Sequence, residues 1–307
     1  MAQHVAIVTG GLRGLGRAMV FGLAREGHNV VAVGHIDVDV AEMEVTKSSS
    51  NLAGQILPLV ADLRRPAECD RVVAMARERF GGVHILVNNA GLTFTTIDPA
   101  RFRRAEPQKF WQVSDDIVHA VIETNYIAAD QMARRVAAKM VEEGWGRIVN
   151  VTTKLDTMNR PHTSPYGASK AALEMATEVW AKEVEGTGLT INIVNPGASA
   201  NTPGMAEEMR MMSREGRAPR LVEPEEMVPP LLWVVSREAD TVNGWRFDAN
   251  LWDPALPTAA ATGLRVRPPV IPRGSRLGGG RHTASSREGP CTPGWCKGIE
   301  RRIVPVN

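Results

Sequence analysis

The chain is poor in cysteine and in aromatic residues, and it lacks a long apolar segment. Only three cysteines, Cys69, Cys291 and Cys296, occur among 307 residues, and aromatic residues make up 5%. Together with His282, the last two cysteines fall short of a zinc-binding pattern, so we expect no metal site. No apolar run approaches the roughly 20 residues that cross a membrane, and no signal peptide is recognisable. These absences argue against a disulfide-stapled or membrane-embedded protein and predict a cytoplasmic one.

The composition changes near residue 257. Hydrophobic residues make up 43% of the chain, enough for residues 1–257 to fold as one domain around a full core. Residues 258–307 are instead rich in arginine, proline, glycine and serine, without a periodic apolar pattern. Nine of the 36 basic but two of the 34 acidic residues lie there, so this tail carries +7 and the domain −5. We expect a disordered tail and, because aromatic residues are nearly absent from it, no nucleic-acid partner.

Short apolar runs alternate with helical stretches through most of the chain. Continuous apolar runs of this length are typical of buried parallel strands. The predicted strands are residues 5–8, 29–33, 56–60, 84–87, 147–151 and 190–194, and the predicted helices are residues 17–26, 68–80, 114–143 and 166–185. This alternation predicts an α/β fold: a Rossmann-like, doubly wound parallel sheet with helices on both faces. Ligands of such sheets gather at the carboxyl ends of the strands.

A glycine-rich turn directly follows the first predicted strand. Residues 9–16 read Thr-Gly-Gly-Leu-Arg-Gly-Leu-Gly and lead into the first predicted helix. The backbone N–H groups and the helix dipole at such a turn attract an anionic pyrophosphate. Glycine is needed where the chain turns tightly and where no Cβ can stand between backbone and phosphate. The turn therefore predicts a dinucleotide site, and a purely structural turn is the alternative.

Tyr166 and Lys170 begin a predicted helix, and Tyr166 comes thirteen residues after Thr153. Positions i and i+4 share one face of a helix, so the Lys170 ammonium can lie beside the Tyr166 phenol. A neighbouring cation lowers the pKa of a tyrosine, as a proton donor to a carbonyl requires. Together with the glycine turn, this pair points to an oxidoreductase.

In order and spacing, these motifs resemble those of the short-chain dehydrogenase/reductase family in its single-domain form. The resemblance covers about residues 3–250 of the chain and implies a last strand over residues 244–248, where the segment 244–253 departs from the glycine pair that the family usually has. It rests on the glycine turn, Asp62, Asn88-Asn89-Ala90-Gly91, Asn125, Thr153, Tyr166 with Lys170, and Pro196-Gly197. The extended branch of the superfamily is the second choice, because it usually carries TGxxGxxG at the turn.

The resemblance implies roles for four catalytic candidates. Tyr166 would be the general acid in reduction and the general base in oxidation. Lys170 would lower the pKa of Tyr166 and bond the nicotinamide ribose. Thr153, where the family usually has serine, would hold the substrate carbonyl through its hydroxyl. Asn125 would hold a water that relays the proton between Lys170 and solvent.

The activity implied is an NAD(P)-dependent interconversion of an alcohol and a carbonyl in a small-molecule substrate. A non-catalytic NAD(P)-binding regulatory protein on the same fold is the alternative. The resemblance also implies a homotetramer or homodimer, built on the helices that carry Asn125 and Tyr166.

The cofactor-binding residues that the resemblance implies stand mainly where the predicted strands end. They are Thr9, Gly10, Arg13, Gly14, Leu15, Gly16, His35, Asp62, Leu63, Asn89, Ala90, Gly91, Tyr166, Lys170, Pro196, Gly197 and Thr202. Asp62 would accept a hydrogen bond from the adenine amino group. Thr202, or Asn201 beside it, would hold the nicotinamide carboxamide.

The end of the second predicted strand bears on the choice between the two dinucleotides. An acidic residue there favours NAD, because a carboxylate binds the ribose diol and repels a 2′-phosphate. This chain has His35 instead, and Arg13 lies where a guanidinium could reach that phosphate. We therefore expect NADP(H) in preference to NAD(H), although Asp37 close by leaves NAD(H) open.

Two segments bear on the substrate. Residues 92–124 are about ten residues longer than in short family members, and a long polar loop of this kind could flank the cleft or an oligomer contact. After Thr153, the polar residues Lys154, Arg160 and His162 suggest an anionic partner, or only a solvated loop. Sugar, polyol, hydroxy acid and oxoacyl substrates all stay open.

Overall fold

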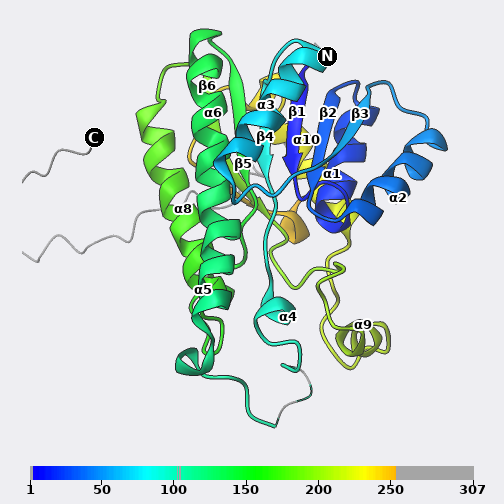
Figure 1. Ribbon diagram of the computed structural model, residues 1–307, viewed down its shortest axis with the longest axis vertical. Coiled ribbons are helices and arrows are strands. Elements are labelled where there is room, and N and C mark those ends of the chain that lie inside the picture. The colour runs from blue at the N-terminus through cyan, green and yellow to red at the C-terminus, as the bar shows by residue number, and fades with distance from the viewer. Residues whose placement is uncertain (1–2, 102, 104, 254–307) are drawn as a thin grey trace, which may run out of the picture. The chain divides into compact units, whose positions relative to one another are not determined.

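Seven parallel strands form one sheet in the computed structural model, which describes residues 3–101, 103 and 105–253. In sheet order the strands are β3 (Ile56–Val60), β2 (Asn29–Gly34), β1 (Val5–Thr9), β4 (Ile85–Asn88), β5 (Gly146–Asn150), β6 (Leu189–Asn195) and β7 (Arg246–Asp248), as Figure 1 shows. The predicted doubly wound sheet is confirmed. The predicted domain boundary at residue 257 and the tail of residues 258–307 lie outside the described residues.

The chain enters the sheet in its middle. Strand β1 pairs with β2 on one side and with β4 on the other, both in parallel. The winding direction reverses between β1 and β4, so the connections that leave these two strands diverge to opposite faces. A crevice at their carboxyl ends follows from this topology.

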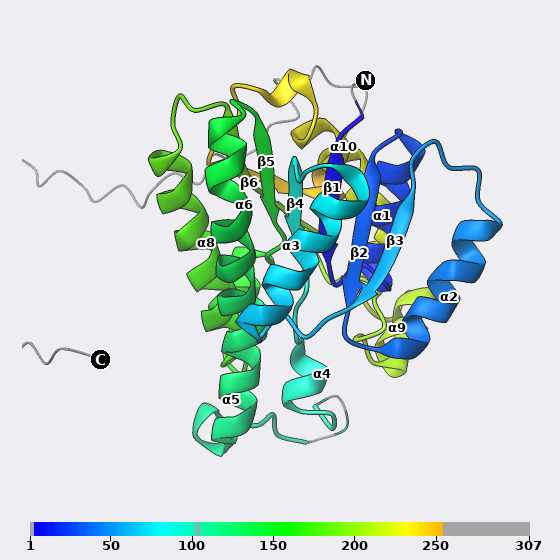
Figure 2. The same cartoon turned by 45° about the horizontal axis from the view of Figure 1, so that its top comes forward.

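Helices cover both faces of the sheet (Figures 1 and 2). Their bounds are α1 (Gly14–Arg25), α2 (Asp37–Ser48), α3 (Pro66–Phe80), α4 (Phe94–Ile97), α5 (Asp115–Ile122), α6 (Ala128–Glu142), α7 (Leu155–Met158), α8 (Tyr166–Glu183), α9 (Glu207–Arg214) and α10 (Val228–Val234). One apolar layer packs α1, α2 and α10 against the sheet, and Met19, Met43 and Leu231 are buried in it. The other layer packs α3, α6 and α8, with Val72 and Met132 buried.

The structure contains a helix that the sequence pattern did not predict. Residues 37–40 alternate between aspartate and valine, as a half-buried strand would, yet they open α2. Asp37 and Asp39 stand in the first turn and Lys47 in the last, where each charge suits the helix dipole. Met43 packs into the core and holds the helix on the sheet.

The predicted helix over residues 114–143 is divided in the structure. Helices α5 and α6 are joined by a π-helical turn over Glu123–Ile127. Such turns occur mostly as single insertions in α-helices, often at functional sites. The Asn125 side chain in this turn is 1% exposed and faces the interior. The period of the sequence predicted the helix, and only the packing around Asn125 shows the extra residue in the turn.

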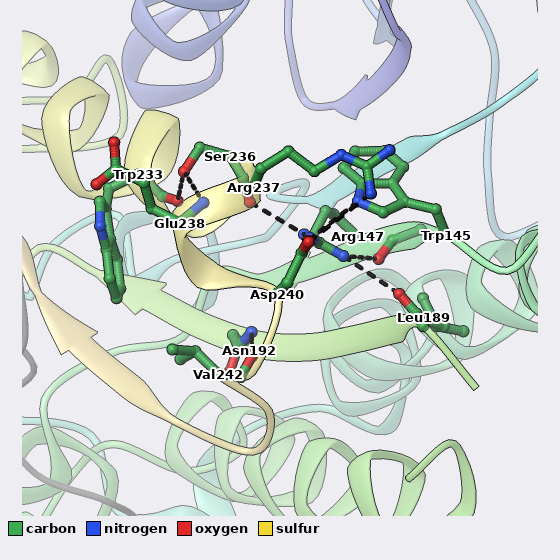
Figure 3. A network of polar contacts seen from close by, with 12 residues as sticks. Trp145, Arg147, Leu189, Asn192, Trp233, Ser236, Arg237, Glu238, Asp240 and Val242 are labelled. Carbon is green, nitrogen blue, oxygen red and sulfur yellow. Dashed lines mark hydrogen bonds and ion pairs between the residues drawn. The ribbon is translucent and has the colours of Figure 1, made fainter. Parts of the chain in front are cut away.

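A buried arginine fixes the amino end of β5 (Figure 3). Arg147 is fully buried and pairs with Asp240, which also accepts a hydrogen bond from Trp145 Nε1 at 3.2 Å. Its guanidinium donates further to the carbonyls of Gly146 and Ser236, at 2.8 and 3.3 Å. This network lies at the end of the sheet away from the predicted site.

No helix among the described residues is both long and apolar enough to cross a membrane.

Candidate active site

The glycine turn closes tightly around its own backbone. Gly10 and Gly14 have φ angles of +63° and +55°, in the left-handed region that favours glycine. A Cβ on Gly16 would lie 2.0 Å from the Gly10 carbonyl oxygen. Helix α1 begins at Gly14, three residues earlier than predicted, so its first N–H groups belong to this turn. The geometry provides the open backbone cradle that a pyrophosphate needs.

The end of β4 is bonded to this turn. Asn89 donates through Nδ2 to the Thr9 and Gly10 carbonyls at 2.9 and 3.1 Å. The Thr9 hydroxyl accepts from the backbone N–H groups of Asn89 and Ala90 at 2.9 and 3.0 Å. Four predicted cofactor residues are thus brought together across the switch point of the sheet.

The ends of β2 and β3 carry charges of both signs. Arg13 lies 3.6 Å from the Asp39 carboxylate, while His35 is exposed. Asp62 is held by Arg64 through two bonds of 2.9 and 2.7 Å, and this arginine lowers the pKa of Asp62. An adenine amino group would have to share this carboxylate with Arg64.

Two further predicted residues, Leu63 and Leu15, are apolar. Leu63 is buried behind the end of β3, and Leu15 packs partly buried against the core. Their side chains help to hold the strand end and the turn, so any contact with a dinucleotide would come from their backbone.

Tyr166 is buried at the first turn of α8, beside the side chain of Thr153. Burial raises the pKa of Tyr166, while the neighbouring Thr153 side chain, as a hydrogen-bond partner, acts in the opposite direction. The net direction is therefore upward, contrary to the lowering that the sequence led us to expect. The desolvation of the phenol outweighs the interactions that favour the phenolate.

Lys170 lies one turn after Tyr166 and is also buried. Its Nζ donates to the Val151 carbonyl at the end of β5, at 2.9 Å. Burial lowers the pKa of Lys170 from 10.5 to about 8, while Glu174 raises it. An ideal Cβ on Gly91 would lie 3.4 Å from both Lys170 Nζ and Asn125 Oδ1, so glycine keeps the space between them open.

The side-chain amide of Asn125 forms hydrogen bonds with the backbone of Leu92 and with the Ser169 side chain of α8. Its Oδ1 accepts from Leu92 N–H at 2.7 Å, and its Nδ2 donates to the Leu92 carbonyl at 3.1 Å and to Ser169 Oγ at 2.9 Å. Ser169 in turn donates to the Tyr166 carbonyl at 2.7 Å. Asn125, Tyr166, Lys170 and Thr153 therefore lie in one cluster at the carboxyl ends of β4 and β5.

The segment after β6 covers the glycine turn. Gly197 has a φ of +74°, and its backbone N–H donates to Asn195 Oδ1 at 2.8 Å. An ideal Cβ on Gly14 would lie 3.0 Å from Pro203 Cδ, which brings Thr202 beside the turn. The Asn201 side chain is bonded to Glu223 at 2.9 Å. Thr202 is therefore the better placed of the two carboxamide candidates, and Pro196 is buried beneath the loop.

Sequence reasoning missed an aromatic and cationic wall beside the tyrosine. The Phe94 ring lies 4.6 Å from the Tyr166 ring, centroid to centroid, and the Arg101 guanidinium lies 4.7 Å above Phe94. Arg101 also donates to the His162 carbonyl at 2.5 Å, and His162 has a φ of +65°. The only sequence signal was the extra length of the loop after Gly91.

A cavity of about 460 Å³ lies beside the segment that leads into α8, and residues of this segment line it. Its lining residues are Lys109, Phe110, Trp111, Met158, Asn159, Arg160, Pro161, His162, Thr163 and Ser164. Phe110 and Trp111 are strongly exposed. Within the described part of the chain, no carboxylate forms an ion pair with Lys109 or Arg160, and no group of three or more side chains suits a metal ion.

The fold and this cluster define a dinucleotide-dependent oxidoreductase. The family model described as short chain dehydrogenase matches residues 4–213, so the chain belongs to the short-chain dehydrogenase/reductase family.

Relatives and solved structures agree with this membership. The chain is 32% identical to a short-chain type dehydrogenase/reductase of Picea abies, over 79% of this chain and 89% of the relative. It is 31% identical to the 3-oxoacyl-acyl-carrier-protein reductase FabG of Thermotoga maritima, over 78% and 93%. A crystal structure of a variant of actinorhodin polyketide ketoreductase with NADPH has a TM-score of 0.68 and 26% identity, over 80% and 95%. The protein is thus an NAD(P)-dependent oxidoreductase, and no finding favours the non-catalytic alternative.

Proposed function

We propose that the protein interconverts an alcohol and a carbonyl in a small-molecule substrate, with Tyr166 exchanging a proton with the substrate oxygen. The observation that carries this proposal is the nearness of the Tyr166 phenol to the Thr153 side chain, with the buried Lys170 one turn along α8. Two hydroxyl groups side by side can both bond one carbonyl oxygen. The glycine cradle and the cluster share one edge of the sheet, as a dinucleotide spanning both requires.

The dinucleotide, when bound, supplies or accepts the hydride at its nicotinamide. The residues of this chain bind the substrate oxygen and transfer the proton. Thr153 holds the substrate oxygen, and Tyr166 donates its phenolic proton to that oxygen during reduction. Lys170 has donors left besides its bond to Val151, so it can bond a ribose hydroxyl and stabilise the phenolate. Asn125 keeps the loop after β4 and the start of α8 in register, and its predicted role in holding a water is part of the proposal.

The experiment that tests the activity is a titration of the purified protein with NADPH and with NADH. Nicotinamide absorbance is then followed with the reduced dinucleotides against ketones, aldehydes and oxo acids, and with NADP+ and NAD+ against polyols. Oxidation of either dinucleotide by one class of carbonyl supports the proposal. Binding without turnover of any member, together with an intact fold, would argue against a catalytic role.

We also propose NADP(H) as the preferred cofactor. Arg13 and Arg64 flank the ends of β2 and β3, where an adenosine ribose would lie, and His35 is exposed just after β2. A guanidinium pairs well with a 2′-phosphate. Asp39 beside Arg13 counts against this preference, because a carboxylate repels phosphate. NADPH in the similar ketoreductase structure supports the proposal without deciding it.

The substrate proposed is a carbonyl compound that bears an anionic group. The cavity beside the start of α8 presents Lys109 and Arg160, which lack acidic partners among the residues described, and two aromatic rings, Phe110 and Trp111. Cations and aromatic faces at one mouth favour a ligand with a carboxylate or phosphate and an apolar body. The alternative is that the polar side chains of this loop only face solvent and bind no substrate. A neutral ester and its free acid, compared as substrates, separate the two.

Homo-oligomerisation and a cytoplasmic location complete the proposal. Met175 and Val179 on α8 and Val141 on α6 are exposed apolar residues on the helices that carry the site. Exposed apolar side chains in such a group favour contact with another copy. Cys69 is buried and free, as expected in a reducing compartment. Light scattering and cell fractionation test these two points.

A further inference from the structure

A buried ion pair joins the last strand to the helix of the tyrosine. Arg246 of β7 pairs with Glu174 of α8 through Nη1 and Oε1, and both side chains are about nine-tenths buried, at 10% and 13% exposure. A buried ion pair is weak support for stability, because desolvation offsets most of the attraction.

The other contacts of this pair are with the segment of the proposed carbonyl-binding residue. Glu174 Oε1 accepts a hydrogen bond from Thr152 Oγ1 at 2.6 Å. Arg246 Nη2 donates to the Thr153 carbonyl at 2.8 Å. The ion pair thus bonds two consecutive residues that follow β5. It bonds Thr152 through its side chain and Thr153 through its backbone carbonyl.

The far side of Arg246 is fixed as well. Its Nε lies 3.4 Å from Asp248 Oδ1, and the same oxygen accepts from Asn195 Nδ2 at 2.5 Å. Asn195 Oδ1 also accepts a hydrogen bond from the backbone N–H of Gly197. The chain of contacts runs from the loop after β6, through β7, to the segment after β5.

We propose that Arg246 and Glu174 are positioning residues for the reaction, which hold residues 152–153 so that the Thr153 hydroxyl faces Tyr166. This inference rests on the proposed function of Thr153 and Tyr166. It goes beyond the family resemblance, because it arises from the segment after residue 244 that departs from the family pattern.

Glu174 has a second effect through its place on α8. It follows Lys170 by four residues, so the two side chains share a helix face, and its charge favours the protonated form of Lys170. The groups near Lys170 are Tyr166 and Glu174, one turn before and one turn after it on α8, Asn125 from the π-helical turn and the Val151 carbonyl just after β5. Because Glu174 is also paired with Arg246, the pair couples the position of Thr153 to the charge of Lys170.

The first test uses Glu174→Gln, with Glu178→Gln as the matched control. Glu178 stands one turn further along α8 and pairs with Lys182 at 2.8 Å. For Glu174→Gln we expect the alkaline limb of the kcat/KM profile for reduction to move to lower pH, with the dissociation constant of the dinucleotide within about twofold of wild type. The control should leave the profile unchanged. An unchanged profile for Glu174→Gln would overturn the coupling.

The second test separates positioning from mere stability. Arg246→Met leaves Glu174 buried without its partner, so both stability and kcat should fall, kcat by about tenfold or more. The double variant Glu174→Met with Arg246→Met removes both charges together and is expected to melt close to wild type. Its kcat should stay low, because the Thr153 carbonyl has lost its donor. Recovery of kcat in a stable double variant would overturn the proposal.

A third measurement does not depend on turnover. In protein with 13C-labelled lysine, the Lys170 resonance is assigned by its loss in Lys170→Arg and titrated by NMR. We expect Lys170 to lose its proton at lower pH in Glu174→Gln than in wild type or in Glu178→Gln. If the wild type reduces no carbonyl, the proposed function fails, while this titration still decides whether Glu174 acts on Lys170. Equal titration in all three proteins would overturn the coupling.

Discussion

Asn125 and Leu92 are joined by two hydrogen bonds, from the Leu92 N–H to Asn125 Oδ1 at 2.7 Å and from Asn125 Nδ2 to the Leu92 carbonyl at 3.1 Å. A side-chain amide thus holds the backbone of the segment that follows β4, which ends at Asn88. The π-helical turn makes this contact possible, because it brings Asn125 into the interior.

Asn125→Asp is expected to lower both stability and turnover. The carboxylate still accepts from the Leu92 N–H but cannot donate to the Leu92 carbonyl or to Ser169 Oγ. Two buried acceptors lose their donor, and the free energy of unfolding should fall by about 1–3 kcal/mol. Urea unfolding measures this change, and Asn51→Asp, at an exposed position, is the control. Equal stability of the two variants would contradict the buried role.

Tyr166→Phe is expected to abolish turnover and to leave dinucleotide binding nearly unchanged. The substitution removes only the phenolic hydroxyl, while the ring keeps its contact with Phe94. Loss of a positioned general acid costs on the order of 10² to 10⁴ in rate. Rates with the best carbonyl substrate and titration with NADPH give the two quantities. Comparable loss of both would show that Tyr166 does not carry the proton.

Lys170→Met is expected to stabilise the protein while it abolishes turnover. Because burial lowers the pKa of Lys170 from 10.5 to about 8, the folded protein binds this proton more weakly than the unfolded chain does. The charged lysine therefore destabilises the fold below about pH 8, by something on the order of 3 kcal/mol. This penalty fades as the pH rises from 8 to 10.5. Urea unfolding should show the variant more stable at pH 7 and the difference smaller near pH 10; a less stable variant at pH 7 would refute this.

Arg13→Ala is expected to weaken the binding of NADPH more than the binding of NADH. If the guanidinium meets the 2′-phosphate, its loss removes a charge-assisted contact, and the dissociation constant for NADPH should rise about tenfold. Arg64→Ala should act in the same direction, because Arg64 lies at the end of the neighbouring strand beside Asp62. Arg25→Ala, at the far end of α1, is the control. Equal weakening of both dinucleotides would remove Arg13 as the phosphate reader.

Three histidines meet at the amino end of the sheet. The His28 and His84 Nδ1 atoms accept from the backbone N–H groups of His4 and Val5, at 3.2 and 3.0 Å, and the His4 ring stacks on Trp145 at 4.0 Å. Burial, with the neighbouring His84, lowers the pKa of His4 to about 4. Burial also lowers the pKa of His28.

Acid is therefore expected to weaken the fold. Groups that the folded state keeps neutral contribute stability above their unfolded pKa of 6.5, and this contribution is lost as the pH falls towards 4. The His4→Phe variant keeps a ring against Trp145 but cannot take up the proton. The decline of its unfolding free energy between pH 6.5 and 4 should be shallower than that of wild type, and His119→Gln, at an exposed position, should follow wild type. Parallel curves for all three proteins would contradict this role of His4.

Local signals were enough for most of the fold and for the chemical class. The apolar runs predicted six strands within a residue of their observed bounds, because a strand buried on both faces needs a mainly apolar segment. The resemblance supplied the seventh, β7, to within two residues. The glycine turn and the spacing of Tyr166 and Lys170 also allowed a dinucleotide cradle and a catalytic pair to be proposed from the sequence, because each depends on residues close together in the chain. Helix α2 was missed because its first turn alternates like a strand, and only the burial of Met43 decides between the two.

The sequence by itself determined which side chains could serve an alcohol–carbonyl oxidoreductase and roughly where each would stand on the sheet. Only the tertiary structure decided how they are held. It showed that burial raises the pKa of Tyr166, that Asn125 lies in a π-helical turn bonded to Leu92, and that Arg246, on the last strand, reaches the carbonyl of Thr153. These properties depend on desolvation and on contacts between residues 33 to 93 positions apart. Neither is encoded in any local pattern, because both arise only when the strands are brought side by side.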